Sequence, residues 1–142
     1  MQKANIVVLG AGAWGSALAT QIAHSNGGCN VVVRRYDQVQ EINETNRNCS
    51  YLGEIKLPHT VKAFETNHDL KPYDIIIIAT PSGAFRQMVD YLKQQNLPSN
   101  IIIINSCKGV DAELLLNSRY LAQKLPHNEQ IILSGPSFAK LM

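Results

Sequence analysis

The chain has 142 residues, 45% of them hydrophobic, and a formal net charge of +2. This length gives one domain of ordinary size, large enough to hold a core without a disulfide or a metal. The Lys and Arg residues are scattered and form no basic stripe, which argues against nucleic-acid binding, and no apolar run approaches the ~20 residues that a membrane-spanning helix needs. Because Cys29, Cys49 and Cys107 lie far apart and no signal peptide precedes them, the chain is expected to be a cytoplasmic protein with reduced thiols.

Six short runs rich in β-branched residues predict strands, in chain order. They cover residues 6–9, 31–33, 61–64, 75–78, 101–104 and 131–133. Most are apolar at every position, which is typical of parallel strands buried on both faces. The run at 61–64 contains a lysine and is expected to be an exposed or edge strand.

Helical patterns separate most of these runs. They cover residues 13–24, 37–46, 82–95 and 112–125, with Pro126 ending the last one, and residues 45–58 form the longest expected loop. Asp37 followed by Gln40 matches a capping box and predicts that Asp37 is the N-cap of the second helix. The alternation predicts an α/β fold of the Rossmann-like, doubly wound type, a mostly parallel sheet with helices on both faces.

A glycine-rich turn follows the first strand and opens the first helix. Its glycines are Gly10, Gly12 and Gly15, in the G-x-G-x-x-G spacing. The first allows a tight turn, the second allows a pyrophosphate to approach the backbone, and the third allows close packing of helix on sheet. In this strand–turn–helix context the motif predicts dinucleotide binding at the helix N-terminus, with a purely structural turn as the alternative.

The end of the second strand is expected to select the cofactor. It carries Arg34, Arg35 and Tyr36, where an acidic residue would be typical of NAD binding. Two guanidinium groups can hold a 2′-phosphate, so NADP is predicted to be preferred, with NAD as the alternative cofactor. If both arginines simply face solvent, this preference has no basis.

Three later loops lie at predicted strand ends, where ligands bind in open α/β sheets. They cover residues 80–83, 105–109 and 134–139. Lys108 could neutralise an anionic substrate or polarise a carbonyl, and Ser137 could donate a hydrogen bond to substrate or cap a helix. The four histidines show no ligand spacing and are interpreted as surface residues, so no metal site is predicted.

Together these motifs resemble the family of NAD(P)-dependent glycerol-3-phosphate dehydrogenases. The resemblance extends over the whole chain and rests on the glycine-rich turn with its Trp14, on Ala17-Leu18-Ala19, Tyr51-Leu52, Leu57-Pro58, Pro81-Ser82 and Lys108-Gly109, and on residues 134–139. It implies hydride transfer between NAD(P)H and dihydroxyacetone phosphate, giving sn-glycerol 3-phosphate. It also implies a phosphate-bearing small-molecule substrate and a homodimer for the full-length enzyme.

The resemblance also implies roles for individual residues. Those expected to contact the cofactor are Ala13, Trp14, Arg35, Tyr36, Tyr51, Lys108 and Ala139, and those expected to bind substrate are Lys108, Gly135 and Ser137. Two positions depart from the family pattern, Gly53 where proline is common and Ala13 where serine is common.

The family's helical second domain, which supplies the proton-transfer lysine, has no counterpart in these residues. Residues 1–142 are therefore expected to form the NAD(P)-binding domain alone and to bind dinucleotide with little or no turnover. The alternatives are a hydroxyacid or nucleotide-sugar dehydrogenase, a stand-alone non-catalytic binding module, and a degenerate fragment.

Overall fold

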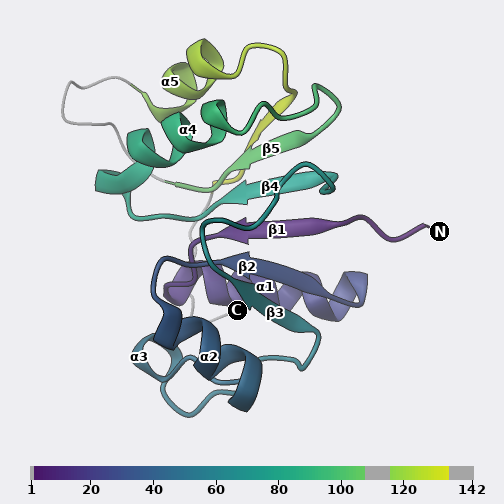
Figure 1. Cartoon of the computed structure of the whole chain (residues 1–142), viewed down its shortest axis with the longest axis vertical. Helices are drawn as coiled ribbons and strands as arrows, with labels where there is room; N and C mark the ends of the chain where they lie inside the picture. The colour runs from purple at the N-terminus through teal and green to yellow at the C-terminus, as the bar shows by residue number, and fades with distance from the viewer. Residues whose placement is uncertain (1, 108–115, 135–142) are drawn as a thin grey trace.

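The computed structural model describes residues 2–107 and 116–134. Its centre is a six-stranded parallel sheet in the order β3-β2-β1-β4-β5-β6 (Figure 1). The strands are β1 (Ile6–Leu9), β2 (Cys29–Val32), β3 (Val61–Phe64), β4 (Ile75–Ile78), β5 (Ile102–Asn105) and β6 (Gln130–Ile132). The strand order reverses between β1 and β4, so the predicted doubly wound fold is confirmed.

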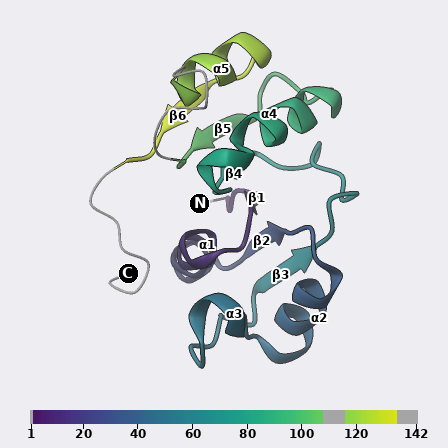
Figure 2. The ribbon, with the colours of Figure 1, turned by 90° about the vertical axis from the view of Figure 1, so that its left-hand side faces the viewer.

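The helices lie on both faces of this sheet. They are α1 (Ala13–Asn26), α2 (Tyr36–Thr45), α3 (Cys49–Leu52), α4 (Phe85–Gln94) and α5 (Asn117–Lys124), with a short 3-10 turn, η1 (Ser82–Ala84), ahead of α4. Figure 2 shows α4 and α5 on the side of the sheet opposite α1. No helix in the described ranges is long and apolar enough to cross a membrane.

Alternate strand residues build two separate cores. In β1, Val7 and Leu9 pack with α4 and α5, whereas Val8 packs with α1 and α2. Because successive side chains point to opposite faces of a strand, a fully apolar strand supplies both cores at once. Val7, Val8 and Leu9 are fully buried, as the uninterrupted apolar pattern predicted.

The two edges of the sheet differ from each other. β3 is an edge strand, as predicted, with exposed Lys62 between buried Val61 and Ala63. β6 forms the other edge, and its Ile131 and Ile132 are exposed, so the expectation of burial on both faces was wrong for this strand. Its position at the edge of the sheet leaves it with only one neighbouring strand.

Several expected boundaries also differ. Residues 45–58 contain the short helix α3, and the helix expected at 112–125 is described only as Asn117–Lys124, because residues 108–115 lie outside the described ranges. Asp37 is not the N-cap of α2, since that position belongs to Arg35 and Asp37 lies in the first turn. Of the histidines, His68 is only partly exposed, and it stacks on Phe64 at 3.9 Å between ring centroids.

Candidate nucleotide-binding cleft

A cleft of about 920 Å³ opens at the carboxyl ends of the central strands. Its walls are the turn after β1, the residues after β2, β4 and β5, and one side of α4. The cleft therefore lies at the point where strand order reverses, which is where ligands bind in open α/β sheets. Its volume is in the range of cofactor and small-molecule sites.

The glycine-rich turn forms the floor of this cleft, and its backbone depends on glycine at two positions. Gly10 has φ +105°, and a Cβ there would lie 2.8 Å from the Ala79 carbonyl oxygen. A Cβ at Gly15 would lie 2.0 Å from the Gly10 carbonyl oxygen, so α1 starts against the turn at a distance that only glycine allows. At Gly12, by contrast, a Cβ would meet only the Tyr51 ring at 3.8 Å, which leaves room for a ligand beside the backbone.

The N-terminus of α1 faces this turn and has features of an anion site. Gly12 occupies the N-cap position without a side-chain cap, and the first turn contains no acidic residue. The first N–H groups of a helix have no partner within the helix and carry the positive end of its dipole. These residues therefore have the free N–H groups and the positive helix end that a pyrophosphate group requires.

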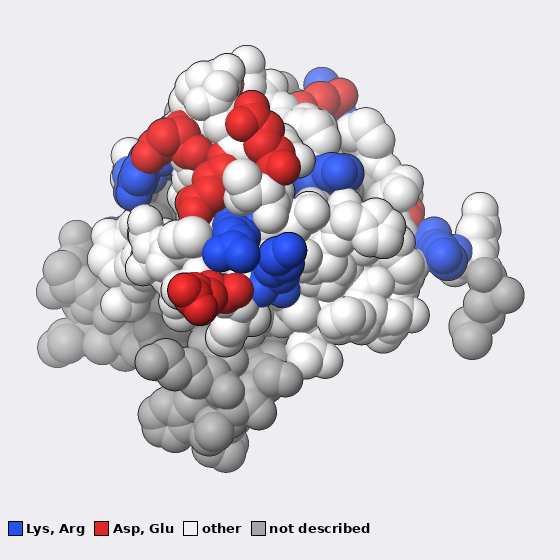
Figure 3. All heavy atoms as spheres, turned by 90° about the horizontal axis from the view of Figure 1, so that it is seen from below, with Lys and Arg blue, Asp and Glu red and all other residues white. Residues whose placement is uncertain are grey.

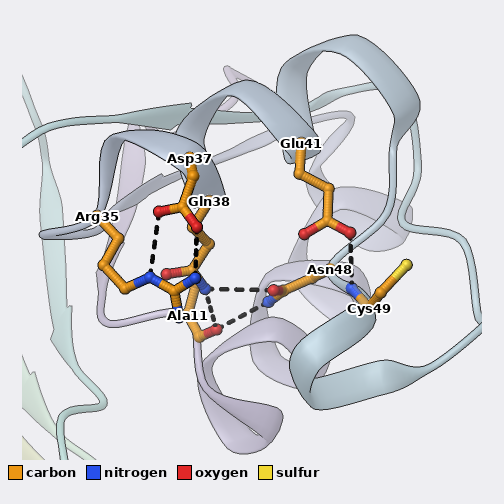
Figure 4. A network of polar contacts seen from close by, with 7 residues as sticks. All are labelled: Ala11, Arg35, Asp37, Gln38, Glu41, Asn48 and Cys49. Carbon is orange, nitrogen blue, oxygen red and sulfur yellow. Dashed lines mark hydrogen bonds and ion pairs between the residues drawn. The ribbon is translucent and has the colours of Figure 1, made fainter.

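Arg34 and Arg35 extend from the end of β2 into the lining of the cleft, and both are exposed. Arg35 forms an ion pair with Asp37, in which its Nε donates to Oδ1 at 3.1 Å and its Nη2 donates to Oδ2 (Figure 4). The hydrogen bond from Arg35 lowers the pKa of the Asp37 carboxyl and raises that of the guanidinium. Arg34 also lines the cleft and contributes a second positive charge to it.

The surface beyond the cleft carries mixed charge. On the face in Figure 3, acidic and basic side chains lie close together and form no continuous basic stripe. On this face, therefore, the described surface gives no sign of the extended positive field typical of nucleic-acid-binding proteins.

Another part of the lining is built from the residues that follow β4 and β5. Ser106 Oγ donates to the Ile78 carbonyl at 2.6 Å, and Cys107 Sγ donates to the Thr80 carbonyl at 3.1 Å. These bonds join the two strand ends side by side. Burial raises the pKa of the Cys107 thiol, so it is a poor nucleophile at neutral pH.

Comparison with known proteins decides the family. The model of the family described as NAD-dependent glycerol-3-phosphate dehydrogenase N-terminus matches residues 5–141. The chain belongs to this family.

Relatives of this dehydrogenase family include proteins named glycerol-3-phosphate dehydrogenase [NAD(P)+]. One from Orientia tsutsugamushi is 37% identical over 94% of this chain and 41% of its own length, and one from Francisella tularensis subsp. mediasiatica is 40% identical over 99% and 42%. The crystal structure of glycerol-3-phosphate dehydrogenase from Coxiella burnetii matches with a TM-score of 0.85 and 30% identity, over 96% of this chain and 42% of that one. The chain thus spans about two fifths of the length of these dehydrogenases.

The structure brings together most of the predicted cofactor residues of this family member. Those lining the cleft are Gly10, Gly12, Ala13, Trp14, Arg34, Arg35 and Tyr51. Gly15 lies beneath the turn, and Tyr36 is exposed at the start of α2, where its hydroxyl accepts a hydrogen bond from Gln40. Lys108, Gly135, Ser137 and Ala139 lie outside the described residues.

Sequence reasoning missed several residues of the cleft. Gln38 lines it from α2, Met88 and Tyr91 line it from α4, and Asn48 lies buried behind the turn. The apolar spacing of α4 made Met88 indistinguishable from a core position, and no cofactor-binding motif contains Gln38 or Asn48.

Proposed function

We propose that this chain is the dinucleotide-binding part of a glycerol-3-phosphate dehydrogenase. In this proposal the cleft binds NAD(P)H, which when bound supplies the hydride that interconverts dihydroxyacetone phosphate and sn-glycerol 3-phosphate. The observation that carries the proposal is the glycine-rich turn, which opens α1 on the floor of the cleft at the switch point of the sheet. The names of the 37–40% identical relatives agree with it.

We also propose that NADP is preferred over NAD. Arg34 and Arg35 follow β2 on the cleft wall, where a 2′-phosphate on the adenosine ribose would lie in this fold. Asp37 already forms an ion pair with the Arg35 guanidinium, so the 2′-phosphate would compete with this carboxylate for Arg35. Arg34 would interact with the phosphate without such competition from Asp37. Both side chains are exposed, so we expect a moderate preference and one that salt weakens.

The test is a titration of the chain with NADPH and NADH, following the fluorescence of Trp14. This is the only tryptophan, and it lines the cleft. We expect saturable quenching, tighter for NADPH. Failure of both nucleotides to bind a folded chain would overturn the proposal.

The cofactor preference has its own variants. Arg34→Ala is expected to weaken NADPH binding about tenfold, equivalent to ~1.4 kcal/mol, and to change NADH binding little. Arg119→Ala is the matched control, because it removes the same charge from an exposed site on α5 away from the cleft. Equal weakening of NADPH and NADH by Arg34→Ala would refute a role in reading the 2′-phosphate.

For the rest of the reaction, we propose the roles that the family resemblance implies. Lys108 would contact cofactor and substrate, Gly135 and Ser137 would hold the glycerol phosphate, and Ala139 would lie against the nucleotide. The proton-transfer lysine and the dimer contacts would belong to a helical domain of the full-length enzyme. A polypeptide of residues 1–142 should then bind NADPH without oxidising it in the presence of dihydroxyacetone phosphate, and steady loss of absorbance at 340 nm would contradict this.

A further inference from the structure

We infer that Asn48 is a positioning residue for the dinucleotide site, acting through the carbonyl group of Ala11. Its side-chain amide holds this carbonyl inside the protein, and thereby directs the N–H of Gly12 toward the cleft. The inference rests on the proposed function, because it assigns a role to Asn48 within the same site.

The contacts of Asn48 are unusual for its position in the chain. It is completely buried and precedes α3, yet its side chain makes no cap hydrogen bond to that helix. Instead, its Nδ2 donates to the Ala11 carbonyl and to Ser16 Oγ, each at 2.8 Å. The amide thus links the loop before α3 to the turn through Ala11 (Figure 4) and to α1 through Ser16.

The Ala11 carbonyl is the centre of this network. It accepts from Asn48 Nδ2 and from Gln38 Nε2 at 2.8 Å each, and from Ser16 Oγ at 3.3 Å. Gln38 Nε2 also donates to Asn48 Oδ1 at 3.2 Å, so the two amides orient each other. Three donors on one carbonyl oxygen fix the orientation of the Ala11 carbonyl, because turning it away would leave buried donors unpaired at a cost in free energy.

The direction of this carbonyl decides the direction of the next amide. In a trans peptide the C=O and N–H bonds point to opposite sides, so a carbonyl held toward α2 and α3 turns the Gly12 N–H the other way. A carbonyl oxygen turned into the cleft would instead present negative charge to a pyrophosphate. The network therefore favours the turn conformation in which donors face the ligand, which is the preorganisation that anion binding needs.

Asn48 also connects the turn to a second wall of the cleft. Its backbone carbonyl accepts from Tyr51 N at 3.1 Å, and the Tyr51 ring lies 3.8 Å from the position of a Cβ on Gly12. Glu41 Oε1 accepts from Cys49 N at 3.0 Å and holds the start of α3 on α2. One residue thus fixes the turn through its side chain and the Tyr51 wall through its backbone.

The experiment compares two variants of the network with a control. Asn48→Asp keeps the shape but replaces the Nδ2 donor with an oxygen, and Gln38→Met removes one donor with little change of shape. The control is Asn43→Ala on the same helix as Gln38, which removes two bonds to the Ala63 backbone, at 2.9 and 2.8 Å, without touching the turn. Each variant is titrated with NADPH and with adenosine 2′-monophosphate, which has no pyrophosphate, and its thermal midpoint is measured alongside.

We expect Asn48→Asp to weaken NADPH binding about tenfold or more and Gln38→Met by about threefold to tenfold, the loss typical of one or more hydrogen bonds. Binding of adenosine 2′-monophosphate should stay within about twofold in both. Asn43→Ala should lower the thermal midpoint and leave both affinities within about twofold. If Asn48→Asp does not fold, Gln38→Met decides.

Each outcome has a distinct meaning. A wild-type chain that binds no dinucleotide overturns both the proposed function and this inference. A wild-type chain that binds NADPH, together with network variants that bind it equally well, overturns the inference alone. A network variant that loses both ligands equally, as a generally loosened protein would, also overturns it.

Discussion

Replacing Gly15 with alanine tests the geometry of the turn most directly. The new Cβ would lie 2.0 Å from the Gly10 carbonyl oxygen and 2.9 Å from its carbon. A carbon–oxygen contact normally needs about 3.3 Å, so the helix and the turn would have to separate by roughly 1.3 Å. Both atoms belong to the backbone of a turn that is bonded to β2 through Gly10 N and the Val32 carbonyl at 2.9 Å, so no side chain can move aside to relieve the contact.

We therefore expect Gly15→Ala to lower the free energy of unfolding by about 3 kcal/mol, at the upper end of the range for overpacking. For a domain of this size that loss corresponds to roughly 10 °C in Tm. Urea unfolding followed by circular dichroism measures it. A midpoint equal to that of the wild-type chain would refute the close approach of α1 to the turn.

Gly12→Ala is the matched comparison, with the opposite expectation. Gly12 has φ −73° and ψ −166°, which alanine can adopt, and its Cβ would meet only the Tyr51 ring at 3.8 and 3.9 Å. Stability should be unchanged or rise by ~0.4–1 kcal/mol, because the unfolded chain loses freedom. NADPH binding should nevertheless weaken, since the added methyl would occupy the space beside the backbone that a pyrophosphate needs. Equal destabilisation by the two alanines would show that the two glycines do not have separate roles.

The remaining predictions concern the core, pH and thiol reactivity. Phe85 is fully buried against the sheet, so Phe85→Ala should cost about 3–5 kcal/mol in urea unfolding, and a loss below about 1 kcal/mol would contradict its place in the core. Burial lowers the pKa of His68 below 6.5, so between the folded-state pKa and 6.5 the unfolded chain binds more protons than the folded chain. The free energy of unfolding should therefore fall as the pH is lowered through this window. A His68→Gln variant with the same pH dependence would exclude His68 as the cause. Burial raises the pKa of Cys29 to about 12, so iodoacetamide at pH 8 should leave it unmodified in the folded protein, and mass spectrometry showing labelling as fast as at exposed Cys49 would contradict this.

The sheet and the turn could be predicted because their signals are local. Each strand is a short apolar run, and the glycine spacing of the turn is contained within six residues. The buried strands β1 and β4 agree with the prediction, whereas β6 has the same apolar pattern and is exposed. An edge strand and a central strand can have the same local pattern, because the number of neighbouring strands is set by the rest of the sheet and not by the strand's own residues.

The error at Asp37 has a similar physical origin. Asp37 with Gln40 satisfies the capping-box spacing, but the helix begins one residue before Asp37, and the carboxylate pairs with Arg35. An N-cap bond to a backbone amide and an ion pair to a guanidinium are alternative partners for one carboxylate. Sequence spacing shows that both are available and does not show which the folded backbone brings closer.

Asn48 could not be found from sequence because its partners are distant along the chain. Ala11 and Ser16 lie 37 and 32 residues away, and neither position carries a pattern that calls for an amide donor. A fully buried site surrounded by helices would ordinarily favour an apolar side chain, since buried amides contribute little net stability even when fully bonded. The Ala11 carbonyl favours an amide instead, because an apolar residue at position 48 would leave this carbonyl with two donors and its orientation less firmly fixed. The presence of an amide at this site is thus better explained by the orientation of the glycine-rich turn than by stability alone.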